Sequence, residues 1–141
     1  MDRGRVAESP KVSVVIPARN EGGEIELCLK SLAAQSFREF EILVVDNGST
    51  DDTEAIARRY GCRVVHEARP GAAFARQRGF DEARGEIIAS TDADTVVPPN
   101  WLELIVRSFE KNPDQVGVYG RIRLREHHGF GQWLAEFLFA L

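Results

Sequence analysis

The stretch "FEILVVDNGSTDDTEAIARRY", residues 40–60, contains a strand, a polar turn and a helix in immediate succession. Residues 40–46 are apolar and rich in β-branched side chains, which predicts a buried strand that ends at "NGS". Ser49 and Asp52 then have the spacing of a capping box with Asp in place of Glu, so we expect a helix from there to about Tyr60. A strand followed by a helix is the unit from which parallel sheets are built.

The same unit occurs before and after this stretch. Residues 11–18 ("KVSVVIPA") predict a strand, and the next helix has one apolar face formed by Ile25, Cys28, Leu29 and Leu32. Residues 62–67 predict a short third strand. The helix after it has a narrow face of small residues suited to close packing, made by Ala72, Ala75, Gly79 and Ala83.

The second half of the chain continues the alternation. Residues 85–91 ("GEIIAST") predict a fourth strand, and Pro98-Pro99 fit the start of a helix. We expect the inner face of that helix to carry Trp101, Leu104, Ile105 and Phe109. Residues 116–124 ("VGVYGRIRL") alternate between apolar and polar side chains, which predicts a half-exposed antiparallel strand.

The last residues, 130–141 ("FGQWLAEFLFAL"), have apolar side chains at helical spacing and no polar cap. We expect a helix that faces the core of a longer protein; the alternative is an interfacial helix at a lipid surface. Left exposed, such a helix would promote self-association.

These elements predict an α/β fold: a three-layer α/β/α sandwich with a mostly parallel sheet and one antiparallel strand near 116–124. We expect an N-terminal tail over residues 1–11 and one domain over 12–126. Residues 127–141 would begin a further, helical segment that is cut short.

The composition of the chain limits the classes of function that it can have. The chain has 141 residues, of which 43% are hydrophobic and 28% charged, as in an ordinary globular domain. Its formal net charge of −4 argues against nucleic acid as a partner. The chain has no signal-peptide pattern and no apolar run of membrane-spanning length, and its cysteines, Cys28 and Cys62, fit buried, reduced thiols. We therefore expect a cytoplasmic protein; the alternative is association of the full-length protein with a membrane.

Polar clusters follow three of the strands: "PARNE" (17–21), "DNGSTDD" (46–52) and "STDADT" (90–95). Parallel sheets bind ligands at the carboxyl ends of their strands, so these clusters predict one shared site. The chain has neither a G-x-G-x-x-G fingerprint after the first strand nor a Gly-Lys-Ser/Thr sequence, which excludes dinucleotide and P-loop sites. A phosphoacceptor receiver domain would need an acidic pair after the first strand, where this chain has Pro17.

Asp92 and Asp94 project to the same side of an extended segment, and the small Ala93 leaves room between them. Two carboxylates without a nearby His or Cys suit a hard cation, Mg²⁺ or Mn²⁺. Such a site is completed by water and substrate phosphate oxygens, which implies a diphosphate. The alternative is an ordinary polar turn.

The chain resembles the family 2 inverting glycosyltransferases, which have the GT-A fold. The resemblance rests on "VSVVIPARNEGGEIELCLKSLAAQSF", "FEILVVDNGSTDDT" and "GAAFARQRGFDEARGEIIASTDAD", in that order, and runs from about Val12 to Leu124. It places "ASTDADT" at the D-x-D metal motif of the family.

The resemblance implies a nucleotide-diphospho-sugar donor, and among these a UDP-sugar. Pro17, Ala18, Asn20 and Glu21 would lie along the nucleoside, although Asn20 also fits a helix N-cap. Asp46 would accept a hydrogen bond from the ring N–H of the base, or would simply be a turn residue. Arg76 would reach the base or the diphosphate. Asp92 would contact the ribose or the metal, and Asp94 would be the main metal ligand. Ala93, which lies between these two aspartates, would contact the donor.

The implied reaction moves the sugar to an acceptor hydroxyl with inversion, assisted by Mn²⁺ or Mg²⁺. The acceptor would be an unknown glycan, a lipid-linked molecule or a small molecule, and residues 127–141 would begin the acceptor-side or helical segment. An interfacial helix there would place the protein near a lipid-linked acceptor. The general base is unknown, because Glu126 and Glu136 lie in no matching motif, and the adjacent His127 and His128 fit a surface role better than a base or metal pair. The alternative function is a non-catalytic nucleotide-sugar-binding or interaction module that retains the fold.

Overall fold

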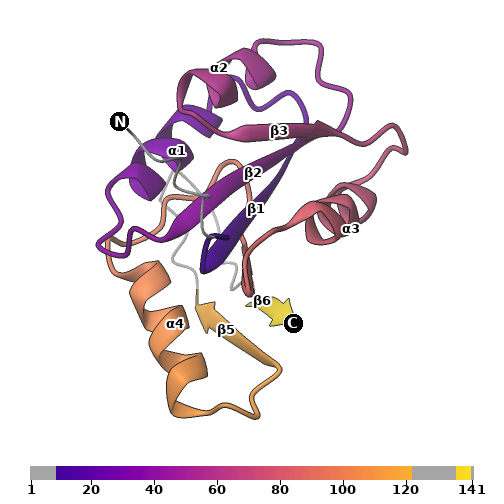
Figure 1. Cartoon of the computed structure of the whole chain (residues 1–141). Helices are drawn as coiled ribbons and strands as arrows, with labels where there is room; N and C mark the ends of the chain where they lie inside the picture. The colour runs from indigo at the N-terminus through magenta and orange to yellow at the C-terminus, as the bar shows by residue number, and fades with distance from the viewer. Residues whose placement is uncertain (1–8, 122–135, 141) are drawn as a thin grey trace, which may run out of the picture.

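The computed structural model describes residues 9–121 and 136–140. Its centre is a four-stranded sheet in the order β3-β2-β1-β4, in which every neighbouring pair is parallel. Figure 1 shows β3, β2 and β1 side by side. The strands are β1 (Val12–Ala18), β2 (Phe40–Asp46), β3 (Arg63–His66) and β4 (Ile87–Ser90). The four predicted parallel strands are therefore confirmed.

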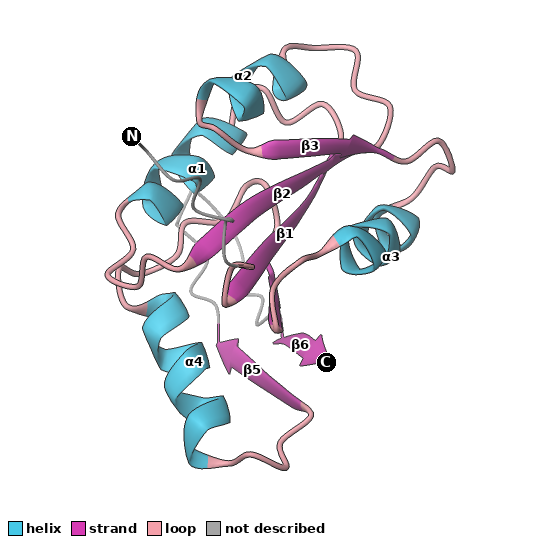
Figure 2. Ribbon diagram, in the orientation of Figure 1, coloured by secondary structure: helices cyan, strands magenta, loops and turns pink. Residues whose placement is uncertain are grey.

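Helices cover both faces of this sheet (Figure 2). The helices are α1 (Ile25–Ala33), α2 (Thr53–Arg59), α3 (Ala72–Glu82) and α4 (Trp101–Lys111). The buried residues of α1, α2 and α4 belong to one apolar cluster, whereas α3 packs on the opposite face. The predicted three-layer α/β/α sandwich is confirmed.

Alternating side chains of β1 supply both clusters. Val12, Val14 and Ile16 face α1 and α2, and Val15 faces α3. A strand buried on both faces reads as a continuous apolar run, as "VSVVI" does.

The packing of α3 depends on one of its small residues. A Cβ atom at Gly79 would overlap the Val15 side chain and lie 3.0 Å from Cγ2 of Val45. Ala75 is also fully buried, but Ala72 is exposed. Only part of the predicted small-residue face therefore packs on the sheet.

Two helix predictions need correction. α2 begins at Thr53 with Asp52 at its N-cap position and no side-chain capping bond, so Ser49 does not open it. The hydroxyl of Ser49 instead accepts a hydrogen bond from the Asn20 N–H (3.0 Å). Tertiary pairing of the two loops replaces the predicted local cap.

The buried residues of α4 are Leu102, Ile105 and Val106. Leu104, predicted on the inner face, is 54% exposed, while Trp101 and Phe109 pack at the margin of the core. The apolar residues of this helix surround more than one face, so spacing alone could not rank Leu102 above Leu104.

Beyond α4, β5 (Gly117–Arg121) and β6 (Glu136–Ala140) form an antiparallel pair. The antiparallel strand predicted near 116–124 is confirmed over Gly117–Arg121, but it pairs with β6 in a separate two-stranded sheet and, within the described ranges, does not join the parallel sheet. The helix predicted over 130–141 is wrong for Glu136–Ala140, which form a strand and pair with β5. The other residues of the predicted helix lie outside the described ranges. The predicted domain boundary at 126 lies outside them too. A short apolar run does not distinguish strand from helix by periodicity, and self-association through an exposed helix loses its basis for these five residues.

No helix in the described ranges has the length and apolar character needed to cross a membrane.

Candidate functional site

A cavity of about 400 Å³ opens at the carboxyl edge of the sheet. It is lined by the loops after β1 and β4, by Asn47 after β2 and by the first residues of α3. The predicted site residues that line it are Pro17, Ala18, Glu21, Asp92, Ala93 and Asp94. Residues from segments far apart in the chain thus meet at the carboxyl ends of the strands, where the sequence predicted a shared site.

The two aspartates of "DAD" differ in their surroundings. Oδ1 of Asp92 accepts a hydrogen bond and ion pair from Nη2 of Arg76 on α3, at 2.9 Å. Asp94 is exposed, and Ala93 between them is buried. Asp92 is therefore oriented by the protein, while Asp94 is accessible to a ligand.

Glu21 adds a third carboxylate to the cavity wall. Its backbone N–H donates to Oγ1 of Thr53 (2.9 Å), which fixes the loop after β1 against α2. Burial raises the pKa of Glu21, and the nearby charge of Asp94 raises it further. Neighbouring carboxylates disfavour the ionised form of Glu21, and a hard cation would neutralise their combined negative charge. Asp92 and Asp94 therefore fit Mn²⁺ or Mg²⁺.

Asn20 does not line the cavity. It has a positive φ of 53°, and its Oδ1 accepts a hydrogen bond from the Thr50 N–H (2.7 Å). The N-cap position of α1 belongs to Glu24, so the alternative role of Asn20 as a helix cap is wrong. Asn20 joins the loop after β1 to the loop after β2.

Asp46 and Asn47 point to different places. Asp46 is buried, and its Oδ2 accepts a hydrogen bond from the Ser49 N–H (3.2 Å) on the α2 side. Asp46 does not line the cavity, whereas its neighbour Asn47 does. The sequence analysis did not single out Asn47.

The Asn47 side chain holds the loop between β3 and α3. Its amide nitrogen donates to the carbonyl oxygens of Glu67 and Arg69, both at 2.8 Å, and its oxygen accepts from the Gly71 N–H at 2.9 Å. Gly71 has a φ of 130°, a conformation that favours glycine. Asn47 thereby builds one wall of the cavity.

Four other lining residues were not named individually as site residues, although the first lies in the predicted polar cluster 17–21: Arg19, Gly71, Ala72 and Ala75. The small side chains at the start of α3 were read as a helix-packing face. A better signal was the position of Gly71-Ala72 at the N-terminus of α3, where backbone can approach a ligand closely.

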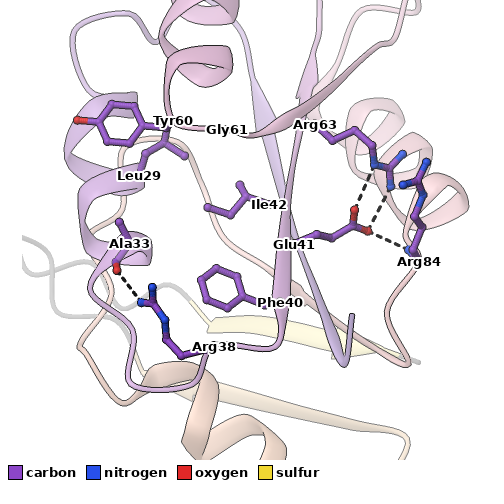
Figure 3. A pocket seen from close by; sticks show the side chains of 10 residues that line it. All are labelled: Leu29, Ala33, Arg38, Phe40, Glu41, Ile42, Tyr60, Gly61, Arg63 and Arg84. Atoms are coloured by element: carbon purple, nitrogen blue, oxygen red, sulfur yellow. Dashed lines mark hydrogen bonds and ion pairs between the residues drawn. The ribbon is translucent and has the colours of Figure 1, made fainter. Parts of the chain in front are cut away.

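A second cavity, of about 500 Å³, lies near the amino ends of β2 and β3 (Figure 3). Burial alone would raise the pKa of its Glu41, but hydrogen bonds from Arg63, Ser13 and the Arg84 N–H lower it. Figure 3 shows Glu41 between Arg63 and Arg84, with apolar side chains on the other side. This cavity is larger, but it lies away from the carboxyl edge and its acid is already satisfied, so the cavity at Asp92 and Asp94 is the candidate site.

Residues 13–139 match the protein family described as Glycosyl transferase family 2. Among curated relatives, the uncharacterized glycosyltransferase YibD of Escherichia coli is 38% identical over 101 residues, which are 68% of this chain and 29% of that protein.

Solved structures of glycosyltransferases are also similar to this chain. S. aureus TarS (residues 1–349), determined in complex with UDP, superposes with a TM-score of 0.73 at 28% identity, over 86% of this chain and 37% of that one. The mannosyltransferase PcManGT from Pyrobaculum calidifontis, in complex with GDP-Man and Mn²⁺, gives a TM-score of 0.69 at 32% identity, over 79% and 35% of the two chains. These similarities confirm the GT-A fold.

The chain spans about a third of the length of the curated relatives that it matches. In five of them it covers between 29% and 38% of the relative's length. The family match nevertheless extends over almost the whole chain and includes every residue that lines the cavity. The chain belongs to glycosyl transferase family 2.

Proposed function

We propose that this chain is the donor-binding part of an inverting glycosyltransferase that moves a sugar from a nucleotide-diphospho-sugar, a UDP-sugar, to an acceptor hydroxyl. The observation that carries the proposal is the cavity at the carboxyl edge, which Asp92 and Asp94 line beside the ends of β1 and β2, with Asp92 paired to the Arg76 guanidinium. An acidic pair beside a basic group suits a cation and the diphosphate that the cation binds.

Asp94 would be the main ligand of the cation, with Asp92 beside it. Bound there, Mn²⁺ or Mg²⁺ neutralises the negative charge that develops on the leaving diphosphate. Arg76 fixes the Asp92 carboxylate before a donor arrives, so that less ordering is left for the binding step.

The nucleoside would lie along Pro17, Ala18 and Glu21, against the wall that Asn47 holds. Asn20 supports this surface from behind by joining the two loops. The contact predicted between Asp46 and the base stays a prediction, which nucleotide titration of Asp46→Asn would test.

The structural relatives support a nucleotide donor but differ in the base. TarS was determined with UDP and with UDP-GlcNAc, and PcManGT with GDP-Man and Mn²⁺. UDP is the nucleotide that the family resemblance implies for this chain. The acceptor and the general base remain unassigned in our proposal, which concerns donor binding and activation of the leaving group.

Calorimetric titration with UDP-, GDP- and TDP-sugars in the presence of Mn²⁺ would test the proposal. We expect one nucleotide sugar to bind per chain, UDP-sugars most tightly, and Asp94→Ala to abolish the dependence on Mn²⁺. Metal-dependent binding of a nucleotide sugar without any hydrolysis or transfer would favour the alternative of a non-catalytic binding module. Failure of all three nucleotide sugars to bind would refute the proposal.

A further inference from the structure

A second cluster of metal-binding side chains lies outside the donor cavity. It consists of Asp46 at the end of β2, His66 at the end of β3 and Glu54 in the first turn of α2. One ligand atom from each residue lies within 4.8 Å of those of the other two. None of the three residues lines the donor cavity.

The topology brings these residues together. Asp46 and His66 are paired in the parallel register of β2 and β3, so their side chains leave the sheet on the same face. That face is the one covered by α2, which carries Glu54. The cluster is therefore a product of the fold and not of one acidic loop.

Asp46 supplies an independent sign that this cluster is a ligand site. The residue is only 5% exposed. Its Oδ2 accepts the Ser49 N–H, but its Oδ1 is buried without a hydrogen-bond partner in the described part of the chain. A buried carboxylate oxygen with no partner is costly and needs an explanation, such as a bound ion.

The other two residues are already oriented. Nε2 of His66 lies 2.8 Å from Oε2 of Glu54, while Oε1 of Glu54 accepts hydrogen bonds from Nε (2.9 Å) and Nη2 (2.7 Å) of Arg58. Arg58 thus holds one oxygen of Glu54 and directs the other toward the imidazole. Supporting contacts of this kind orient the ligands of metal sites.

We propose that Asp46, Glu54 and His66 bind a transition-metal cation of the Zn²⁺ class. One imidazole nitrogen and two carboxylate oxygens make a three-ligand set that leaves a coordination position for water. The imidazole favours Zn²⁺ over Mg²⁺ and Ca²⁺, which prefer oxygen ligands. The side chain of His66 is 59% exposed, so the cation can enter from solvent.

This site is distinct from the cation site proposed for the donor. Asp92 and Asp94 offer only oxygens and need a diphosphate to complete the shell, whereas the second cluster supplies three protein ligands of its own. Zn²⁺ should therefore bind there without nucleotide, and it should raise the thermal stability because the unfolded chain lacks the preformed cluster.

Titration of the nucleotide-free protein with Zn²⁺, by calorimetry and by thermal unfolding, tests this proposal. We expect one Zn²⁺ per chain and an increase in Tm. His66→Gln and Glu54→Gln should each weaken Zn²⁺ binding by about tenfold or more. Asp94→Asn and His128→Gln serve as matched controls, for the donor aspartate and for the adjacent histidines in the sequence, and should bind Zn²⁺ like the parent protein.

Three results would overturn the proposal: no stoichiometric Zn²⁺ binding, undiminished binding by His66→Gln, or loss of binding in either control. Titration of the same variants with UDP and Mn²⁺ separates this site from the donor site. Nucleotide binding that survives in His66→Gln and Glu54→Gln supports two separate sites. Nucleotide binding that is lost in both variants would instead give Asp46 and its neighbours to the base, against the proposal.

Discussion

Nη2 of Arg76 lies 2.9 Å from Oδ1 of Asp92, which joins helix α3 to the loop after β4, and Asp92 lines the candidate donor cavity. The guanidinium is 24% exposed and the carboxylate 40%, so the pair is partly shielded from solvent. This contact assigns different tasks to the two aspartates of the D-x-D triplet. Asp92 is held by the protein, and Asp94 is an exposed residue of the cavity lining.

Replacing Arg76 should weaken donor binding. Arg76→Lys loses the planar guanidinium, and Arg76→Ala leaves Asp92 without its partner, so we expect nucleotide affinity to fall by about tenfold, or roughly 1.4 kcal/mol. Arg78→Lys is the matched control, because Arg78 lies on the same helix and pairs with Glu82 at the surface. Calorimetric titration with UDP and Mn²⁺ measures the affinity of each variant. If the Arg76 variants bind UDP as tightly as Arg78→Lys, the Arg76 contact has no role in binding.

Asn47→Ala should destabilise the cavity wall. The substitution removes the partners of the Glu67 and Arg69 carbonyls and of the Gly71 N–H, and the free energy of unfolding should fall by about 1–3 kcal/mol. Gln77→Ala, which removes an exposed amide that contacts Asp81, should change it by less than about 0.5 kcal/mol. Urea unfolding compares the two variants. A near-neutral Asn47→Ala would mean that the loop does not depend on this side chain.

Gly79→Ala should separate α3 from the sheet. The added methyl group would overlap Val15 and press on Val45, so we expect a loss of about 1–3 kcal/mol in the free energy of unfolding. Gly23 offers a control, because a Cβ there meets nothing within 4 Å. If thermal unfolding shows Gly79→Ala to be no less stable than Gly23→Ala, the close approach of α3 to β1 is not as described.

Glu67 should make stability sensitive to acid. Hydrogen bonds from the Arg69 side chain and backbone N–H lower the pKa of Glu67 to about 2. Because the folded-state pKa lies below the ordinary value, the ionised carboxylate stabilises the fold above that ordinary value, and this contribution is lost as the pH falls toward about 2. Glu67→Gln should therefore flatten the stability profile in that range, measured by urea unfolding at several pH values.

Glu86→Gln is the control for this profile, since the ion pair between Glu86 and Lys11 lies at the surface. Its stability should follow the parent curve in acid. A parent-like acid profile for Glu67→Gln as well would contradict the assigned role of the Glu67–Arg69 contact.

Much of the fold could be predicted because burial is periodic. Ile25, Cys28, Leu29 and Leu32 were predicted as the inner face of α1, and these are its buried residues. The same reasoning chose Leu104 in α4, where Leu102 and Val106 are buried instead, because several apolar residues surround that helix. β6 was predicted as a helix since a short apolar run carries no information on the strand that it will pair with.

The candidate site was predictable to the extent that it depends on strand ends. The edge rule brought Pro17, Glu21, Asp92 and Asp94 to one cavity. It could not decide which of two adjacent residues, Asp46 or Asn47, faces that cavity, because a single step along a strand end reverses the side-chain direction. Contacts such as Asn47 to Gly71 depend on loop geometry that no local pattern encodes.

Metal-dependent binding of UDP is the most direct test of the central claim that Asp92 and Asp94 mark a donor site. Calorimetry should be run on the parent protein and on Asp94→Asn, each with Mn²⁺ and with EDTA. We predict that UDP binds the parent protein at one site, that removal of Mn²⁺ weakens binding by at least about tenfold, and that Asp94→Asn eliminates this difference while retaining the parent Tm. UDP affinity that is the same with and without Mn²⁺, or unchanged by Asp94→Asn, would contradict the account.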